Sequence, residues 1–360
     1  MVSKAPGRPV IKVAVATTDW SGSVHDDRGW PVMGGAGWIR LGQWAKFSGN
    51  HVVVGELIDN GVTMGARTFD AQSHLNTPVL IMQRFMDKSI PRKIERSILN
   101  GQKVINDIDD WFWGIHPENM AAKHVDPDLN PDRNVNYYRE ALEASSIVTT
   151  STPFLAHLLS EWGIKPIIVE NKVSFHVFPT RRHLSPTPII GWVGSTGHRS
   201  GDLKILREPF AVMKDKVSFH HTGDHTKHVS FAEEVGLDDA RVTRLPMLAP
   251  HEYPHGFKFD IGVVPLTDND FNRAKSWIKG IEYAAAGVPF VASPLPEYIR
   301  LRDEYGIGRI AHSPEEWVEH FTELLDPSVR LEEAKRQRII VEARLGARQM
   351  AREWDSIVWL

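Results

Sequence analysis

Short apolar runs alternate with amphipathic segments along the first half of the chain. The apolar runs have the length of buried strands and cover residues 10–17, 51–58, 78–82, 103–108, 146–150 and 166–169. Between them, apolar residues recur with helical spacing over residues 38–47, 91–99, 137–144 and 153–162. Ser151 and Thr152 stand before the last of these segments as candidate N-caps. Because alternating strands and helices usually build parallel sheets, this half predicts a parallel sheet covered by helices.

The same alternation starts again after residues 180–188, a stretch with two prolines and no apolar period. Strands are expected at residues 189–193, 217–221, 259–265 and 290–292, and helices at 204–214 and 274–286. Ser313 should cap a later helix, and the chain should close in a helix rich in Arg and Glu, from about residue 331 to 353. The pattern predicts an α/β protein with two Rossmann-like, doubly wound parallel-sheet domains.

Length and composition agree with two globular domains and a cleft between them. The 360 residues exceed what one compact core usually spans, and 42% apolar with 24% charged residues excludes disordered, collagenous and coiled-coil chains. The 42 basic residues are balanced by 45 acidic ones, so no overall basic field would attract nucleic acid. The sequence has no cysteine, no apolar run of membrane-spanning length and no apolar signal-peptide core near Met1. We therefore expect a cytoplasmic enzyme without an integral membrane segment or a nucleic-acid partner.

Two glycine-rich turns, one in each half, follow a predicted strand and precede a predicted helix. The first contains Gly34, Gly35 and Gly37, and the second spans residues 194–198. Backbone N–H groups and a helix dipole at such a turn can hold a phosphate. Neither turn has the G-x-G-x-x-G spacing of dinucleotide sites, and no Walker lysine follows either one. An ordinary structural turn, in which glycine is needed for a positive φ, remains the alternative for each.

The segment 271–296 carries the most informative polar pattern. If residues 274–286 form a helix, Lys275, Lys279 and Glu282 share one face. Lys275 and Ser276 at the helix start could meet a diphosphate, and Glu282, about 10 Å further along the axis, could reach a ribose. The alternative is an exposed Lys/Glu stripe with no binding function.

The run NRAKSWIKGIEYAAAGVPFVAS, residues 272–293, resembles the donor-binding segment of GT-B nucleotide-sugar glycosyltransferases of the group 1 type (family 4). The likeness is greatest to bacterial and phage members with a KS-x-x-K-x-x-E-Y pattern. Three further segments match in the order that the family has them: VINDIDDWFW at 104–113, IIGWVGSTGH at 189–198 and DIGVVPL at 260–266. The resemblance therefore covers both halves of the chain.

This resemblance implies a GT-B fold with an acceptor-side domain at 1–178, a linker at 179–187, a donor domain at 188–344 and a C-terminal helix at 345–360 that packs back on the first domain. It implies a hexosyltransferase-type glycosyltransferase (EC 2.4) that moves a sugar from a nucleoside-diphosphate sugar to an acceptor hydroxyl with retention of configuration and without a cofactor. The acceptor is open: a glycan, a protein or a small molecule. A GT-B nucleotide-sugar epimerase and a non-catalytic nucleotide-sugar-binding relative remain alternatives.

Residue by residue, the resemblance implies that Glu282 binds the donor ribose and that Lys275 and Ser276 bind the diphosphate, with Lys279 beside them. The second glycine turn and the adjacent Arg199 would face the phosphates, and the turn consists of Gly194, Ser195, Thr196, Gly197 and His198. Lys275 and Arg199 would then stabilise the charge on the leaving phosphate. The loop containing Gly34, Gly35 and Gly37 would lie across from them. Many members carry a second glutamate eight residues before Glu282, where this chain has Ala274.

Asp107, Asp109 and Asp110 resemble the DxD metal motif of the other glycosyltransferase architecture, because paired carboxylates suit Mg²⁺ or Mn²⁺. In a GT-B setting we expect no metal, and place Asp109 and His116 with Asp110 in the cleft as candidate catalytic residues. A buried or capping role stays open for each one.

Two further clusters have both a binding and a structural interpretation. His220, His221, His225 and His228 are numerous enough for zinc, but neighbours on a strand point to opposite faces. Trp111, Phe112 and Trp113 could stack on a sugar ring, although such aromatic residues more often pack in a core.

Overall fold

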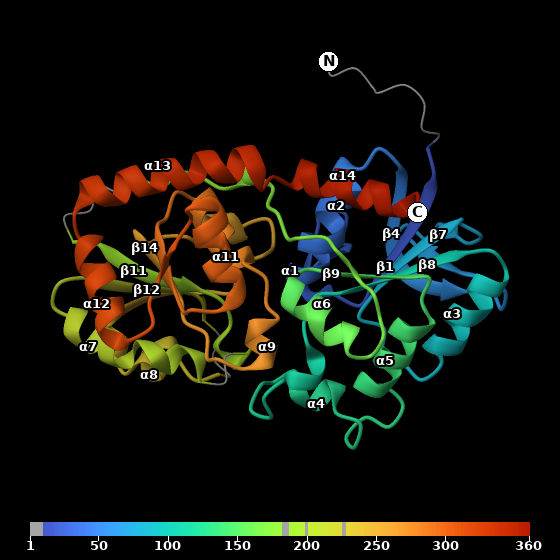
Figure 1. Ribbon diagram of the computed structural model, residues 1–360, viewed down its shortest axis with the longest axis horizontal. Helices are drawn as coiled ribbons and strands as arrows, with labels where there is room; N and C mark the ends of the chain where they lie inside the picture. Colours follow the sequence, from blue (N-terminus) through green and yellow to red (C-terminus); the bar gives the residue numbers. More distant parts are fainter. Residues whose placement is uncertain (1–9, 182–186, 199–200, 225–227) are drawn as a thin grey trace, which may run out of the picture.

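The computed structural model describes residues 10–181, 187–198, 201–224 and 228–360, and two α/β halves lie side by side in it (Figure 1). Strands β1 and β4 to β10 precede the predicted linker and form the sheet of the N-terminal half, whereas β11 to β16 follow it and form that of the C-terminal half. Most of the linker, residues 182–186, lies outside the described residues, as do Arg199 and His225.

The sheet of the N-terminal half has the order β10-β9-β8-β7-β1-β4-β5-β6. All pairs are parallel except those that β5 and β6 make at one edge. Every residue of β1 after Lys12 is buried, as expected for a central strand with helices on both faces. The bounds are β1 Lys12–Thr17, β4 His51–Asp59, β5 Met64–Arg67, β6 Ser73–His74, β7 Val79–Gln83, β8 Lys103–Ile108, β9 Ile147–Thr150 and β10 Ile167–Ile168.

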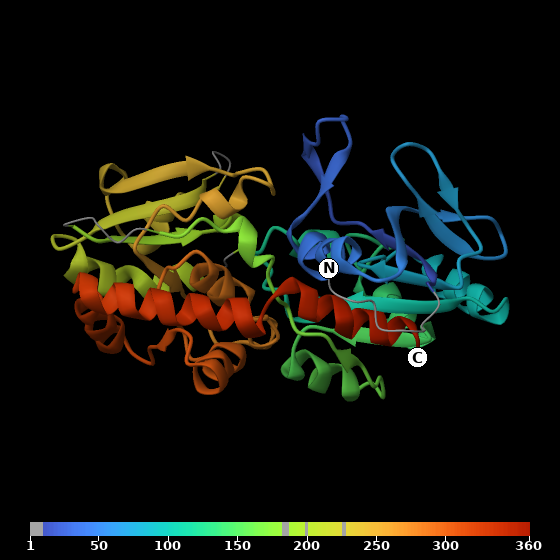
Figure 2. The same ribbon diagram turned by 90° about the horizontal axis from the view of Figure 1, so that it is seen from above.

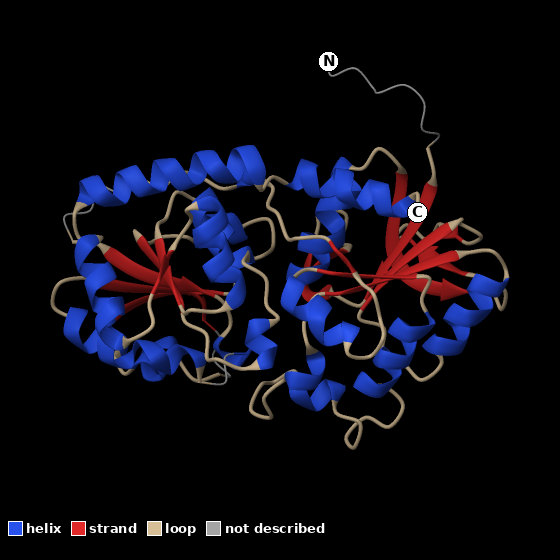
Figure 3. Cartoon of the chain, in the orientation of Figure 1, coloured by secondary structure: helices blue, strands red, loops and turns tan. Residues whose placement is uncertain are grey.

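Helices cover both faces of this sheet (Figure 3). The side chain of Thr152 accepts a hydrogen bond from the N–H of Leu155, which confirms the cap predicted for α6. A small hairpin of β2 and β3 projects from the loop after β1 (Figure 2). The remaining bounds are β2 Trp20–His25, β3 Pro31–Met33, α1 Gly35–Gly37, the π-helix η1 Trp38–Gly42, α2 Gln43–Phe47, α3 Ile90–Leu99, the 3₁₀ turn η2 Phe112–Gly114, α4 Ala122–Val125, α5 Val135–Ala144, α6 Pro153–Ser160 and the 3₁₀ turn η3 Phe175–Val177.

The sheet of the C-terminal half is parallel throughout, in the order β13-β12-β11-β14-β15-β16. This is the doubly wound order, in which the strand order reverses at the first strand and a crevice opens at the carboxyl ends. The strands are β11 Ile189–Val193, β12 Ser218–Asp224, β13 Val242–Pro246, β14 Ile261–Val264, β15 Phe290–Ala292 and β16 Arg309–Ile310. Two mainly parallel sheets flanked by helices confirm the predicted fold class.

Helices also flank this second sheet, and the Ser313 side chain accepts from the N–H of Glu316, as the predicted cap requires. The helices are α7 Arg207–Met213, α8 Phe231–Val235, α9 Asp270–Arg273, α10 Ile278–Ala285, α11 Pro296–Tyr305, α12 Pro314–Glu323, α13 Pro327–Arg344 and α14 Ala347–Val358. The 3₁₀ turns are η4 Thr196–His198, η5 Asp202–Leu206, η6 Asp239–Arg241 and η7 Tyr253–His255.

The helix expected over residues 331–353 is two helices, α13 and α14, that meet at Leu345 and Gly346. Leu345 is fully buried in the core of the C-terminal half, and its N–H bonds back to Val341. Gly346 is extended, so the chain leaves α13 and crosses to the other half before α14 starts. There the indole rings of Trp44 on α2 and Trp354 stack with centroids 5.6 Å apart, which holds α14 on the N-terminal half (Figure 1).

Candidate functional site

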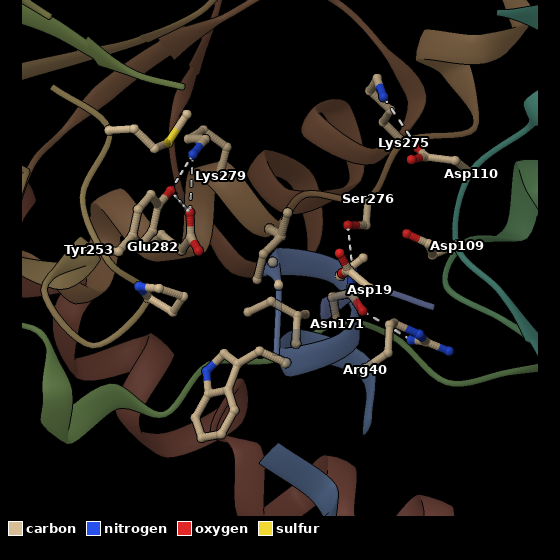
Figure 4. A pocket seen from close by; sticks show the side chains of 18 of the residues that line it. Asp19, Arg40, Asp109, Asp110, Asn171, Tyr253, Lys275, Ser276, Lys279 and Glu282 are labelled. Atoms are coloured by element: carbon tan, nitrogen blue, oxygen red, sulfur yellow. Dashed lines mark hydrogen bonds and ion pairs between the residues drawn. The ribbon is translucent and has the colours of Figure 1, made fainter. Parts of the chain in front are cut away.

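A cavity of about 580 Å³ lies between the two halves at the carboxyl ends of their strands. The N-terminal half contributes the loop after β1, the first glycine turn, Arg84 after β7, and Asp109 and Asp110 after β8. The C-terminal half contributes Trp192 of β11, the loop after β13, and residues Lys275 to Glu282 around the start of α10. Figure 4 shows side chains from both halves converging there.

Glu282 on α10 forms a compact polar cluster in this cavity with Lys279 and Tyr253. The Tyr253 hydroxyl donates to Glu282 Oε2 at 2.8 Å, and Lys279 Nζ lies 3.3 Å from the same oxygen (Figure 4). Glu282 is only 6% exposed, so its charge needs this nearby cation. Sequence reasoning missed Tyr253, because it lies in η7, in a long loop whose position no periodic pattern reveals.

The helix predicted over residues 274–286 is wrong in its first turn. Helix α9 ends at Arg273 and α10 starts at Ile278, so Lys275 and Ser276 lie in the connection between them. Lys275 therefore does not share a helical face with Lys279 and Glu282, although all of them line the same cavity.

The physical reason for this break is a set of contacts with the N-terminal half. The carbonyl of Ala274 accepts from Thr152 Oγ1 at 2.9 Å, and the indole N–H of Trp277 donates to the carbonyl of Asn171 at 2.9 Å. The Asn171 side chain also donates to Ser276 Oγ at 2.7 Å (Figure 4). In a continuous helix the carbonyl of Ala274 would accept from a backbone N–H one turn later, whereas here it accepts from Thr152 of the other half.

Lys275 points across the cavity to the acidic residues of the N-terminal half. Its Nζ lies 3.2 Å from Asp110 Oδ1 and 3.8 Å from the ring centroid of Phe271. Arg84, which has a left-handed φ of 63°, pairs with the carboxylate of Asp109 and lies 3.4 Å from that of Asp110. Burial raises the pKa of Asp109, and the nearby charge of Asp110 adds to this shift, whereas Arg84 opposes it.

Asp107 has a structural role in the core. It is fully buried, and Arg40, also fully buried, donates to both of its oxygens at 3.1 and 2.7 Å. Gln83 Nε2 and Thr149 Oγ1 also donate to this carboxylate. Over the ranges that the structure covers, no three His, Asp or Glu side chains gather as a metal site would require.

The first glycine turn already holds an anion of the chain itself. The N–H of Gly37 donates to Asp19 Oδ2 at 2.6 Å, and the N–H of Gly34 donates to the Asp19 carbonyl at 2.7 Å. A Cβ on Gly34 would lie 2.3 Å from Asp19 Oδ1, so a larger residue there would displace the Asp19 carboxylate. Gly34, Gly35 and Asp19 line the cavity, whereas Gly37 does not. Sequence reasoning missed Asp19, although it stands just after the first strand, where site residues concentrate.

The second glycine turn lies outside the lining of this cavity. Gly194, with φ 154°, packs against Gly223, and its carbonyl is 2.9 Å from His221 Nε2. Gly197 contacts Met120 of the other half, whose N–H donates to its carbonyl. None of the five residues Gly194, Ser195, Thr196, Gly197 and His198 lines the cavity, and Arg199 is outside the described residues. His116 lines a separate, much smaller cavity with Asp202 and Asn272.

The two remaining clusters pack in cores. His221 is stacked between Trp192 and Phe231, and burial lowers the pKa of His221 and that of His220, the latter to about 4. Trp111 and Trp113 pack on Trp162, and no residue of 111–113 lines the cavity. The packing alternative is therefore the one observed for His220, His221 and residues 111–113, whereas His228 is only half-buried.

Comparisons with known proteins connect this geometry to glycosyltransferases. No protein-family model matches the chain. The putative teichuronic acid biosynthesis glycosyltransferase TuaH of Bacillus subtilis (strain 168) is 28% identical over an alignment of 148 positions that covers 38% of this chain and 36% of that protein. The match thus spans about a third of the curated relative.

Solved structures match over nearly the whole chain. HepE of Anabaena in complex with UDP-glucose has a TM-score of 0.64 at 14% identity and covers 97% of this chain and 100% of its own. Sucrose-phosphate synthase from Thermosynechococcus elongatus has a TM-score of 0.58 at 16% identity, with 97% and 98% coverage. A glycosyltransferase from Rickettsia africae has a TM-score of 0.62 at 13% identity, with 97% of both chains covered. The GT-B fold and the resemblance predicted from the sequence are confirmed. Among the described helices, none is long and apolar enough to cross a membrane.

Proposed function

We propose that this GT-B chain is a glycosyltransferase that uses a nucleoside-diphosphate sugar as donor. The observation that carries the proposal is the cavity between the two halves, where lysines of one half face carboxylates of the other and Arg84 pairs with Asp109. Lys275 and Lys279 with Glu282 come from the C-terminal half, and Asp109 and Asp110 come from the other. We keep the predicted division into an acceptor-side domain at 1–178, a linker at 179–187 and a donor domain at 188–344 as part of this proposal.

In this proposal the donor lies along the C-terminal wall. Glu282, with one oxygen bound by Tyr253, accepts hydrogen bonds from the ribose hydroxyls. Lys275 and Ser276, just before α10, meet the diphosphate, where the N–H groups of the helix start add a favourable dipole. HepE has been solved with UDP and with UDP-glucose, which supports a nucleotide-sugar donor for a chain of the same fold.

Catalysis in this arrangement depends on charge. As the glycosidic bond breaks, negative charge grows on the leaving phosphate, and a positioned cation stabilises it. Lys275, which pairs with Asp110 when no donor is present, would exchange this partner for the phosphate and free the Asp110 carboxylate to face the sugar or acceptor. We propose hexosyl transfer with retention and without a metal, in the cytoplasm, and we leave the acceptor open.

The first test measures nucleotide binding, and the second separates donor binding by Glu282 from leaving-group stabilisation by Lys275. UDP, GDP, ADP and TDP and their sugars are added in a thermal-shift assay, where the correct ligand raises the melting temperature by mass action. Glu282→Gln should mainly raise the donor KM, because ribose contacts change little in the transition state. Lys275→Ala should lower kcat by about 10²-fold, as for other preorganised charge stabilisers.

Glu332→Gln and Lys335→Ala, on exposed positions of α13, are the matched controls and should behave like the parent. Transfer should continue in EDTA. Product analysis separates the alternatives, because a transferase releases the nucleoside diphosphate, an epimerase returns an isomeric nucleotide sugar and a binding protein leaves the donor intact. If none of the nucleotides or nucleotide sugars raises the melting temperature, the proposal is overturned.

A further inference from the structure

Two segments of the chain connect the halves, and they lie side by side. Residues 169–173 leave the N-terminal half, and Leu345 to Ala347 return to it. The N–H of Val173 donates to the carbonyl of Leu345 at 3.0 Å, and the N–H of Ala347 donates to the carbonyl of Val173 at 2.9 Å. We call this pair of connecting segments the hinge, and α13 and α14 run along the two halves on either side of it (Figure 2).

A second cavity, of about 350 Å³, opens beside this hinge. Residues from three places line it: the end of α2, the segment 173–177 and the junction of α13 with α14. None of its lining residues belongs to the cavity between the sheets. Phe47 from the N-terminal half and Val173 and Phe175 from the hinge give it an apolar floor. Its volume suits a small organic ligand.

Basic residues outnumber acidic ones in the lining of this second cavity, which we call the hinge pocket. Lys46, Arg348 and Arg352 line it, and in the described parts of the chain none of them pairs with a carboxylate. His176 also lines it, and Glu342 is its one acidic lining residue. The Arg348 guanidinium lies 5.0 Å from the ring centroid of Phe47, so a cation stands directly beside the apolar floor.

Two further features near the apolar floor of the hinge pocket, a helix start and a serine hydroxyl, could also interact with an anion. Helix α14 starts at Ala347 without a side-chain cap and without an acidic residue in its first turn, and the Val173 carbonyl accepts from the Ala347 N–H there. Ser174 Oγ has no hydrogen-bond partner among the residues that the structure describes, and a rotation about χ1 is enough to turn a serine hydroxyl. Cations beside aromatic rings favour a ligand that has both a phosphate and an apolar portion.

We propose that the hinge pocket binds a phosphate monoester with an apolar body, at a site separate from the donor cavity. The phosphate would bind Lys46, Arg348 and Arg352, and the apolar part would lie on Phe47 and Phe175. The ligand is either a free phosphorylated metabolite or the headgroup of an anionic lipid, since both present this chemistry. Because the pocket is lined from both halves, a bound ligand would hold the hinge in one arrangement.

The test measures binding of phenyl phosphate to the full chain by calorimetry. The parent should bind it, and the double variant Arg348→Ala/Arg352→Ala should bind it roughly tenfold or more weakly, as expected for the loss of charge-assisted contacts. Lys214→Ala/Lys216→Ala, which removes two exposed charges elsewhere in the C-terminal half, is the matched control and should bind like the parent. Circular dichroism confirms that each variant is folded.

The remaining arms locate the ligand and identify its source. Lys275→Ala should leave phenyl phosphate binding unchanged, and a loss there would place the ligand in the donor cavity and overturn the proposal. Equal binding of phenyl phosphate by the parent and all variants would also overturn the proposal. It would likewise be overturned if the parent bound neither millimolar phenyl phosphate nor vesicles containing phosphatidic acid. If the parent sediments with these vesicles and the Arg348/Arg352 double variant does not, the ligand is the headgroup of an anionic lipid.

Discussion

The carboxyl group of Glu297 shows how burial at a single residue sets a protonation state. Glu297 opens helix α11 and is 1% exposed. Burial raises the pKa of Glu297 to about 7, although Arg300 pairs with it at 2.8 Å and opposes the shift. Within the described part of the chain, its second oxygen, Oε2, has no hydrogen-bond partner, so protonation of this group relieves an unsatisfied charge.

This residue predicts a pH dependence of stability with a definite sign. The folded-state pKa of Glu297 lies above its unfolded value, so the folded protein binds more protons at pH values between about 4.5 and 7. The free energy of unfolding should therefore fall as pH rises through this window. Relative to Glu297→Gln, the parent should lose on the order of 1 to 3 kcal/mol between pH 5 and pH 8 in urea denaturation.

Glu304→Gln is the control for that experiment. Glu304 contacts the same arginine, but its side chain is 48% exposed. Its unfolding free energy should follow the parent at every pH. Parallel curves for the parent and Glu297→Gln would show that the carboxyl group titrates normally.

At the scale of elements, one carboxylate adds hydrogen bonds to the apolar packing that docks α14 on the N-terminal half. Asp355 Oδ1 accepts from the indole N–H of Trp44 at 2.8 Å and from Asn50 Nδ2 at 3.1 Å, and Oδ2 accepts from the N–H of Gly49 at 2.9 Å. These donors come from α2 and the loop that follows it. The contact therefore joins two elements about 300 residues apart in the sequence.

We expect Asp355→Ala to loosen this docking. The variant leaves the Trp44 N–H without its acceptor, and the free energy of unfolding should fall by about 1 to 3 kcal/mol. Hydrogen exchange should rise in α14 more than in α13. Ser356→Ala is the neighbouring control, since Ser356 is exposed and bonds only within its own helix. Equal exchange in both variants would contradict the docking role of Asp355.

At the scale of the whole molecule, the relative placement of the halves shapes the cavity in which we propose that the donor binds. Thr152 Oγ1 performs two tasks at once, since it accepts from the N–H of Leu155 as the cap of α6 and donates to the carbonyl of Ala274 across the cleft. The cap is a local interaction. The second bond connects the halves next to Lys275.

Thr152→Val should therefore affect both stability and donor binding. Loss of the cap lowers the free energy of unfolding by about 0.5 to 2 kcal/mol. Loss of the bond to Ala274 should also raise the donor KM, because Lys275 and Ser276 are no longer held against the other half. Ser313→Ala removes a cap from α12, away from the donor cavity, and should lower stability alone. An unchanged KM in Thr152→Val would show that the bond across the cleft does not position the donor site.

Local patterns in the sequence determined most of the elements. The predicted strands at 103–108, 189–193 and 290–292 match β8, β11 and β15 residue for residue. Thr152 and Ser313 cap helices as predicted, because a cap needs only a side-chain oxygen and the next turn of backbone. The resemblance of residues 272–293 predicted the GT-B fold and placed Glu282 and Lys279 together, since their spacing lies within one continuous helix.

Only the tertiary structure decided what depends on contacts distant in sequence. The break at residues 274–277 follows from bonds to Thr152 and Asn171, which no local propensity encodes. The Asp19 carboxylate fills the first glycine turn, and Tyr253 reaches Glu282 from a loop without periodic pattern. The sequence thus determined the elements and the fold class, because hydrophobic periodicity and capping act within a few residues. The tertiary structure determined which side chains meet in the cavity, because burial and hydrogen bonding across the cleft select their positions.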